Sequence, residues 1–275
     1  MTEKTEKAGK TGNFEKNNGI VYISSPALAR FPAVVHSFLG RKGGVSKKEF
    51  SSLNMDLRGG DKKEDVEKNR EAAAGIFGFR KEALVTMNQV HGDSVLTVRD
   101  KNQGCYESCE ADAIVTNQRG IPIGVLTADC LPMLFLDYGK NVIAAAHAGW
   151  KGTVKGIAEK TVLAMKEKFG SKPEDIIAAL GPCIGPCCFV VASGVAAEFK
   201  KAFGDSRYIK EGSSPAIDLA GINILQLEKA GVRRKNISIA RACTFCRNDL
   251  FFSYRKDGKT TGRQLGFIML KEAKK

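Results

Sequence analysis

From about residue 32 onward the chain alternates between apolar runs of strand length and amphipathic stretches of helix length. A strand is predicted where about four to eight apolar or β-branched residues stand between turn-forming residues. By this pattern, strands lie within residues 32–40, 84–92, 94–100, 111–117, 121–137, 141–149, 175–181 and 237–243. The runs 111–117, 121–137 and 141–149 are almost continuously apolar, which indicates strands that are covered on both faces.

Helical periodicity appears in four segments between these runs. The sequence predicts helices over 66–78, over 153–169, within 189–204 and over 221–231, with Asp65 as the N-cap of the first and Gly231 ending the last. The C-terminal runs 251–258 and 266–270 are interpreted as a pair of strands. Strand–helix alternation mixed with hairpin-like pairs favours an α/β fold with mixed sheets rather than a purely parallel sheet.

The N-terminal segment differs from the rest of the chain. Residues 1–18 are polar and are predicted to form a disordered leader, and residues 19–275 are predicted to form a single domain because no linker or repeat divides them. No run reaches the roughly 18–20 apolar residues that cross a bilayer, and the leader lacks the apolar core of a secretory signal. We therefore expect a cytoplasmic protein with no membrane partner, in which the eight cysteines are mostly reduced thiols.

The formal net charge of +13 raises the question of a nucleic-acid partner. The lysines are scattered over tails and helix-like stretches, and few aromatic residues stand among them to stack on bases. The sequence therefore favours a small anionic ligand such as phosphate and predicts no nucleic-acid partner.

Candidate chemistry is concentrated in three segments at the ends of apolar runs: NQVHG (88–92), TADCLP (127–132) and AHAGWKG (146–152). They supply His91, Cys130 and His147, a ligand set that suits zinc and leaves one coordination position open for catalysis. The alternative is that the two histidines are buried strand-end residues and Cys130 is an inert buried thiol. Gly92 and Gly149 favour the metal interpretation, because glycine lets the backbone approach a ligand closely.

Two further segments have less specific patterns. Arg41, Gly43 and Gly44 form a basic glycine loop that could bind phosphate, although an ordinary hairpin turn explains the same pattern and no Walker motif is present. Cys243-x-x-Cys246 resembles half of a zinc ribbon. No second C-x-x-C is present, and the other cysteines (Cys105 with Cys109, and Cys183 with Cys187 and Cys188) have the spacing C-x-x-x-C, so a second metal site is not predicted.

Taken together, these motifs resemble the laccase-domain family, which is also described as polyphenol oxidase and as zinc-dependent purine nucleoside phosphorylase. The resemblance covers about residues 20–270 and rests on NQVHG, ADAIVTN with TADCLP, AAHAGWKGTVKGI, LGPCIGPCCFVV, CTFCRNDLFFSYRKDGKTTGRQLGFIML and the loop VVHSFLGRKGGVSKKEFSSLN. It implies an α/β/β/α layered fold and zinc bound by His91, Cys130 and His147. It also implies phosphorolysis of adenosine, inosine, guanosine and methylthioadenosine, together with adenosine deamination.

For such an enzyme we expect phosphate to bind at Arg41, Gly43 and Gly44. Asp129, next to Cys130, is a candidate acid–base group or a support for the ligand, and His36 is a candidate for the same pocket. The family loop usually has threonine before its arginine, whereas Gly40 stands there in this chain.

Three other functions remain open at this point. Cys130 and His147 could act as nucleophile and base of a cysteine hydrolase or deamidase. Copper could enter the Cys/His site and give a polyphenol oxidase, although three histidines in the whole chain are too few for several coppers. A basic RNA-binding or partner-binding protein would leave the Cys/His set unexplained.

Overall fold

The computed structural model describes residues 3–4, 14–99, 106–204 and 206–272. Its strands form two large sheets and one small one. In spatial order, the first sheet contains β1 (Glu3–Lys4), β2 (Phe14–Asn17), β3 (Ile20–Ile23), β4 (Val34–Leu39), β14 (Gln264–Leu270) and β7 (Ile123–Thr127). The second contains β13 (Ile237–Ile239), β10 (Ile177–Leu180), β8 (Leu131–Asp137), β9 (Val142–Ala148), β6 (Ala113–Thr116) and β5 (Val95–Val98). The small sheet pairs β11 (Ile209–Lys210) with β12 (Ala216–Ile217).

Seven α-helices are present in the described part of the chain: α1 (Pro26–Ala29), α2 (Lys63–Phe77), α3 (Trp150–Val154), α4 (Ile157–Phe169), α5 (Ser193–Phe203), α6 (Leu219–Lys229) and α7 (Tyr254–Asp257). Short 3₁₀ turns span Lys48–Phe50, Lys81–Ala83, Tyr106–Ser108, Pro173–Asp175 and Arg234–Asn236. In the described residues, no helix is both long and apolar enough to cross a membrane.

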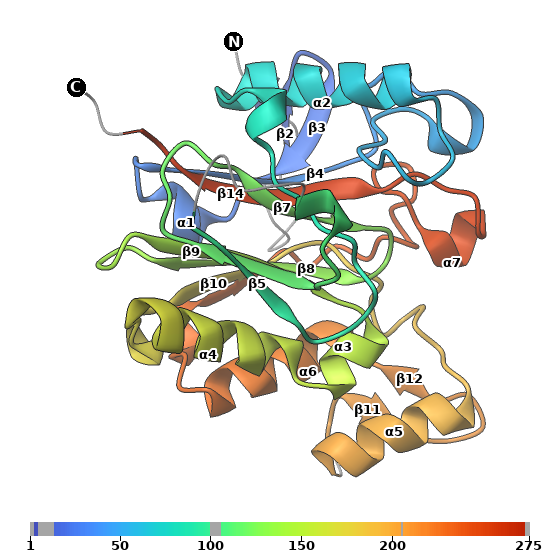
Figure 1. Ribbon diagram of the computed structural model, residues 1–275. Helices are drawn as coiled ribbons and strands as arrows, with labels where there is room; N and C mark the ends of the chain where they lie inside the picture. Colours follow the sequence, from blue (N-terminus) through green and yellow to red (C-terminus); the bar gives the residue numbers. More distant parts are fainter. Residues whose placement is uncertain (1–2, 5–13, 100–105, 205, 273–275) are drawn as a thin grey trace.

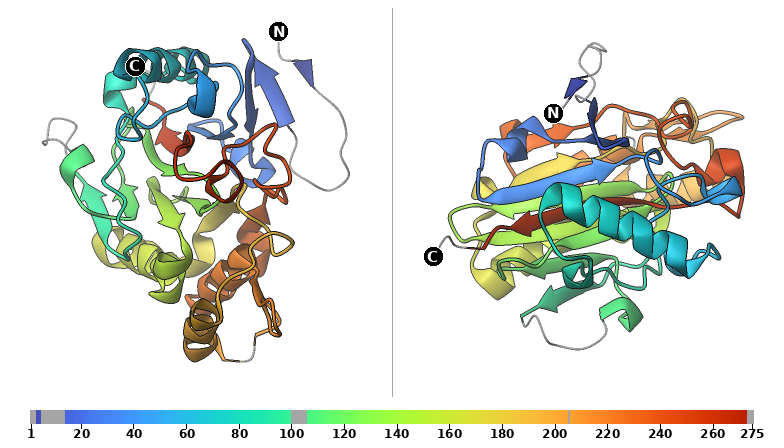
Figure 2. Two further views of the ribbon diagram at one scale, coloured as in Figure 1. Left: turned by 90° about the vertical axis from the view of Figure 1, so that its right-hand side faces the viewer. Right: turned by 90° about the horizontal axis from the view of Figure 1, so that it is seen from above.

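The two large sheets stack face to face between two helical layers, as Figure 1 shows. Helix α2 covers the outer face of the first sheet and crosses its strands when seen from above (Figure 2), while α4 and α6 cover the outer face of the second. This α/β/β/α arrangement of mixed sheets confirms the predicted fold class. Among the strand pairs that the described residues form in the two large sheets, β5–β6 and β10–β13 are parallel and the others are antiparallel.

Alternation along β8 explains why its sequence is apolar throughout. Met133 and Phe135 point to the layer of α4 and α6, whereas Leu134 and Leu136 point into the core between the sheets. Strand β9 follows the same rule with smaller residues. Both strands are buried on both faces, as their apolar runs predict.

Four predicted elements differ in the structure. The run 84–92 forms only single bridge pairs, because Val85 joins Ile123 in the first sheet while Asn88 joins Glu110 beside the second, so this segment connects the sheets. The helix predicted over 153–169 is divided at Gly156, whose φ of +84° is left-handed.

Helix α2 begins at Lys63 with Lys62 in the N-cap position, so Asp65 lies inside its first turn. In place of the strand predicted over 251–258, the chain forms α7, with Ser253 as a capping residue that accepts a hydrogen bond from the Lys256 backbone N–H.

Residues 14–17 of the predicted leader form β2, which is paired with β3 in an antiparallel register. Most of the remaining leader lies outside the described residues, as does Cys105.

Candidate metal and substrate site

The structure brings His91, Cys130 and His147 together at one edge of the second sheet. The register of β8 and β9 places Pro132 opposite His147, so that Cys130, just before β8, lies beside the histidine. His91 arrives from the connector between the sheets. The ligand atoms of the three residues lie within 4.8 Å of one another, and Cys130 Sγ is 3.8 Å from His91 Nε2.

One buried carboxylate, that of Asp112, orients both histidines. Its Oδ1 lies 2.7 Å from His147 Nδ1 and accepts the backbone N–H of His91 at 3.0 Å. Its Oδ2 accepts the backbone N–H groups of Gly92 at 2.6 Å and Val90 at 3.2 Å. Because Nδ1 of His147 is engaged by Asp112, Nε2 is the nitrogen left to coordinate an ion.

Sequence reasoning missed Asp112, although a signal was present. The residue is an acid inside the apolar run ADAIVTN, and its side chain is fully buried. Asp93, another acid beside the His91 turn, instead forms a surface ion pair with Lys160.

Glycine at position 149 allows the three ligands to meet. A Cβ there would lie 2.6 Å from His91 Cδ2 and 3.2 Å from Cys130 Sγ, so any larger residue would displace the ligands. The predicted close backbone approach is confirmed at this position. His91 itself has a left-handed φ of +58°, which the hydrogen bond from its N–H to Asp112 supports.

The electrostatics of the group favour a cation. Burial raises the pKa of the Cys130 thiol. The nearby His147 and His91 lower it by a larger amount, so that the pKa is about 6. Burial lowers the pKa of His147, whereas Cys130 and Asp112 raise it, to about 9. Burial raises the pKa of Asp112, but His147 and the backbone N–H groups outweigh it and the pKa is lowered. Two negative groups, the Cys130 thiolate and the Asp112 carboxylate, therefore lie beside His147 and His91.

The ligand group lines a cavity of about 730 Å³, a volume typical of small-molecule sites. Four cationic side chains also line it: Arg58, Lys151, Arg255 and Arg263. Three aromatic residues complete the walls, namely Trp150, Phe189 and Tyr254. The cavity thus offers cations for an anionic group and flat apolar faces for a ring.

Asp129 lies in the cavity wall with both carboxylate oxygens engaged. Its Oδ1 accepts a 2.6 Å hydrogen bond from Thr244 Oγ1, and its Oδ2 accepts a 2.7 Å bond from the Arg255 backbone N–H. The backbone of Asp129 has a left-handed φ of +82°. These contacts tie the turn that carries Cys130 to the segment that carries Arg255.

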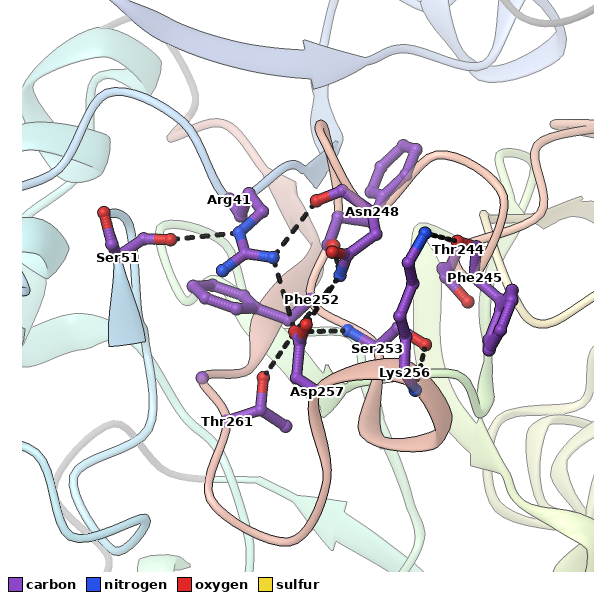
Figure 3. Close-up of polar contacts among 12 residues, drawn as sticks. Arg41, Ser51, Thr244, Phe245, Asn248, Phe252, Ser253, Lys256, Asp257 and Thr261 are labelled. Atoms are coloured by element: carbon purple, nitrogen blue, oxygen red, sulfur yellow. Dashed lines mark hydrogen bonds and ion pairs between the residues drawn. The ribbon is translucent and has the colours of Figure 1, made fainter. Parts of the chain in front are cut away.

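The loop expected to bind phosphate does not line this cavity. Arg41 donates from Nε to Ser51 O at 3.0 Å and from Nη1 to Asn248 O at 3.1 Å, and it pairs with Asp257 at 3.3 Å (Figure 3). Its guanidinium also stacks 4.6 Å above the Phe252 ring. The guanidinium is therefore used to anchor the C-terminal segment.

The two glycines of this loop serve packing, and His36 lies elsewhere. A Cβ on Gly43 would lie 2.5 Å from the Gly19 backbone, and Gly44 lies against the backbone of Ser52 and Leu53. His36 is buried in β4, where its Nε2 accepts the Ser25 backbone N–H at 2.9 Å. Burial lowers the pKa of His36 to about 4, and this residue does not line the cavity either.

A fold with a His/Cys/His group beside an open, cation-lined cavity defines a protein with a candidate metal centre for small-molecule chemistry. Residues 35–271 match the family described as multi-copper polyphenol oxidoreductase laccase, and the chain belongs to this family.

Similar proteins cover nearly the whole chain. The purine nucleoside phosphorylase YlmD of Bacillus subtilis is 37% identical over 249 residues, which cover 87% of this chain and 90% of the relative. The purine nucleoside phosphorylase YfiH of Escherichia coli is 39% identical over 234 residues, covering 84% and 91%. The crystal structure of YlmD from Geobacillus stearothermophilus superposes with a TM-score of 0.86 at 34% identity, covering 94% of this chain and 98% of that one.

Proposed function

We propose that this chain is a zinc-dependent purine nucleoside phosphorylase that cleaves adenosine, inosine, guanosine and methylthioadenosine with phosphate, and that it also deaminates adenosine. The observation that carries the proposal is the convergence of His91, Cys130 and His147 beside a cation-lined cavity of nucleoside size. The names of relatives that share more than a third of their residues with this chain support the same activity.

The donor set fits zinc better than the copper of an oxidase. Two imidazoles and one thiolate are ligands that Zn²⁺ prefers, and His91, Cys130 and His147 would hold it with one position open. A bound zinc ion supplies Lewis acidity at that open position. The chain contains three histidines, of which His36 is buried elsewhere, so the ligands of several coppers are not available.

Phosphate is expected at the cavity cations instead of the Arg41 loop. Lys151 follows the segment that carries His147, and its Nζ lies 5.6 Å from the Trp150 ring centroid. Arg255 also lines the cavity, and its Nη1 donates to Val190 O at 2.8 Å. These cations would hold the phosphate dianion against the ribose, and the aromatic walls would hold the purine.

Phosphorolysis uses phosphate as the second substrate, and deamination uses water. In phosphorolysis a phosphate oxygen bonds to C1′ of the ribose while the bond from C1′ to the purine nitrogen breaks, and the free base takes up a proton. In deamination water adds at C6 of the purine and ammonia leaves. Asp129 supports both reactions as a positioning residue, because its two oxygens hold Thr244 and the Arg255 backbone.

Product analysis tests the proposal directly. Purified protein incubated with adenosine and phosphate should yield adenine and ribose 1-phosphate, with inosine from the deaminase reaction. Omitting phosphate should abolish adenine formation but not inosine formation. Cys130→Ala should abolish both activities, whereas the matched variant Cys109→Ala, at an exposed cysteine outside the site, should retain them. A protein that releases neither adenine nor inosine would contradict the proposal.

The geometry favours one second candidate, a cysteine hydrolase. Cys130, His147 and Asp112 form a thiol–imidazole–carboxylate arrangement of the kind that activates a nucleophile. Iodoacetamide and chelators separate the two functions. Rapid alkylation of Cys130 in the protein as isolated, with activity that a chelator leaves intact, would favour the hydrolase. Protection from alkylation and loss of activity with a chelator would favour the phosphorylase.

A further inference from the structure

A second cluster of cysteines lies apart from the His/Cys/His group. Cys187 and Cys188 come from the loop between β10 and α5, and Cys243 and Cys246 from the segment after β13. Their four sulfur atoms lie within 4.8 Å of one another. We propose that these four cysteines bind a structural zinc ion that joins the loop carrying Ile184 and Phe189 of the cavity wall to the segment that leads to Arg255.

The sulfur geometry matches one tetrahedral ion. Cys188 Sγ lies 3.4 Å from Cys246 Sγ, and Cys187 Sγ lies 3.8 Å from the same atom. A tetrahedron with Zn–S bonds of about 2.3 Å has sulfur–sulfur edges of about 3.8 Å. An ion therefore fits with adjustments of a few tenths of an ångström. Four thiolates around one centre favour Zn²⁺ or a single iron, and they leave no open position for substrate.

The backbone around the cluster is arranged to hold thiolates. The Gly185 N–H donates to Cys243 Sγ at 3.2 Å, a contact that stabilises a negative sulfur. Cys183 and Cys243 form a parallel bridge pair, which aligns the two loops before the thiols meet. A Cβ on Gly185 would lie 3.3 Å from Cys187 Sγ, so glycine leaves room for that sulfur.

Cationic groups flank the cluster on the side of α7. Lys256 Nζ donates to Phe245 O, between the two cysteines of the C-x-x-C pair, at 3.4 Å (Figure 3). The Arg255 guanidinium reaches Cys188 O at 3.5 Å. Four thiolates and a divalent ion carry a net charge of −2, which these cations offset. Cys187 and Cys246 are exposed, so the ion has a route from solvent.

The position of the cluster explains what the ion would do. The loop with Cys187 and Cys188 carries Ile184 and Phe189 of the cavity wall, and the other segment leads to Arg255. Both segments lie outside the strands and α-helices, and the Cys183–Cys243 bridge pair joins them. A bound ion would fix their relative position, as structural zinc does in small folds.

Metal content separates the two sites. Protein purified without chelator should contain two zinc ions per chain by elemental analysis, and Cys130→Ala and Cys246→Ser should each contain one. Cys109→Ser, which replaces an exposed cysteine outside both groups, should retain two. In Cys130→Ala, cobalt substitution should give the intense sulfur-to-metal absorption of a tetrahedral thiolate site. One zinc in the wild type and none in Cys130→Ala would overturn the proposal, whatever the enzymatic activity.

A measurement without substitutions at the cluster guards against variants that fail to fold. In folded wild-type protein, Cys187 and Cys246 should react with iodoacetamide about tenfold more slowly than Cys109, and a chelator should remove that protection. Reaction of all three at similar rates before chelation would contradict a bound ion. A disulfide between any two cluster cysteines in the isolated protein, found by peptide mapping, would contradict it as well.

Discussion

Replacing Asp112 by asparagine is the sharpest test of how the His/Cys/His group is built. The carboxylate accepts four hydrogen bonds, two at each oxygen, from His147 Nδ1 and from the backbone N–H groups of Val90, His91 and Gly92. Asparagine keeps one oxygen and places an NH₂ group where the other was, so two donors lose their acceptor. Each buried unsatisfied donor costs about 1–3 kcal/mol, and the half-exposed Val90 lowers the sum. We expect a loss of about 2–4 kcal/mol.

The assay measures folding and metal binding separately. Urea unfolding of the chelator-treated protein gives the free energy of unfolding without a contribution from bound metal. Competition with a chromophoric chelator gives the zinc affinity, which should fall about 10–100-fold, because groups that orient metal ligands have effects of this size. Asp93→Asn is the matched control, since it removes an exposed ion pair with Lys160 and should change the free energy of unfolding by less than about 0.5 kcal/mol.

Similar behaviour of the two asparagine variants would refute the reasoning. If Asp112→Asn unfolds at the urea concentration of the wild type and binds zinc within about twofold of it, Asp112 does not organise the ligands. Loss of zinc affinity with unchanged stability would assign the carboxylate to metal binding alone.

Three further predictions concern single side chains. Gly149→Ala should contain about one zinc ion fewer per chain than the wild type in elemental analysis, because its Cβ would lie 2.6 Å from His91 Cδ2. Gly75→Ala, with open space inside α2, should contain as much zinc as the wild type. Burial lowers the pKa of His36 from 6.5 to about 4, so between these pH values the folded state binds fewer protons than the unfolded state. The free energy of unfolding should therefore fall by about 3 kcal/mol as the pH drops from 6.5 to 4, and urea titrations of His36→Gln should lack this loss. Arg41→Gln should lower Tm but leave the KM for phosphate unchanged, because Arg41 holds backbone carbonyls outside the cavity. Lys151→Gln should raise the KM for phosphate about tenfold in kinetic assays. A raised KM in Arg41→Gln and an unchanged KM in Lys151→Gln would restore the Arg41 loop as the phosphate site.

The hydrophobic pattern of the sequence predicts the layered α/β fold, but it does not predict the structure of segments that lie outside the sheets. The sequences of β8 and β9 are apolar on both alternating sets of positions, which predicts strands buried on both faces, and the structure confirms this prediction. Residues 84–92 also contain apolar and β-branched residues, but they pair with two different sheets in turn and form no continuous ladder. The segment 251–258 failed as a strand because Ser253 caps a helical turn and Asp129 accepts the N–H of Arg255. Such long-range partners leave no trace in a hydropathy pattern.

The candidate metal ligands were recognisable because each stands in a segment with its own signature. Their partners were not, because Asp112 and the cavity cations Arg58 and Arg263 reach the site only through tertiary structure. The four-cysteine cluster is a similar case. Spacing counted along the chain argued against it, whereas the bridge pair of Cys183 and Cys243 brings two distant cysteine pairs together.

Arg41 and Lys151 illustrate what separates a cation that holds the fold from one that is available to bind substrate. Both occur beside glycines, and both carry the same charge. Arg41 donates to two backbone carbonyls and one carboxylate and also covers an aromatic ring, so binding phosphate there would break contacts already formed. Lys151 lines the cavity, and its Nζ lies 5.6 Å from the centroid of the Trp150 ring. Phosphate can bind the ammonium group of Lys151 without breaking contacts of the kind that hold Arg41. We therefore expect the anion site at the cavity wall and not at the glycine loop.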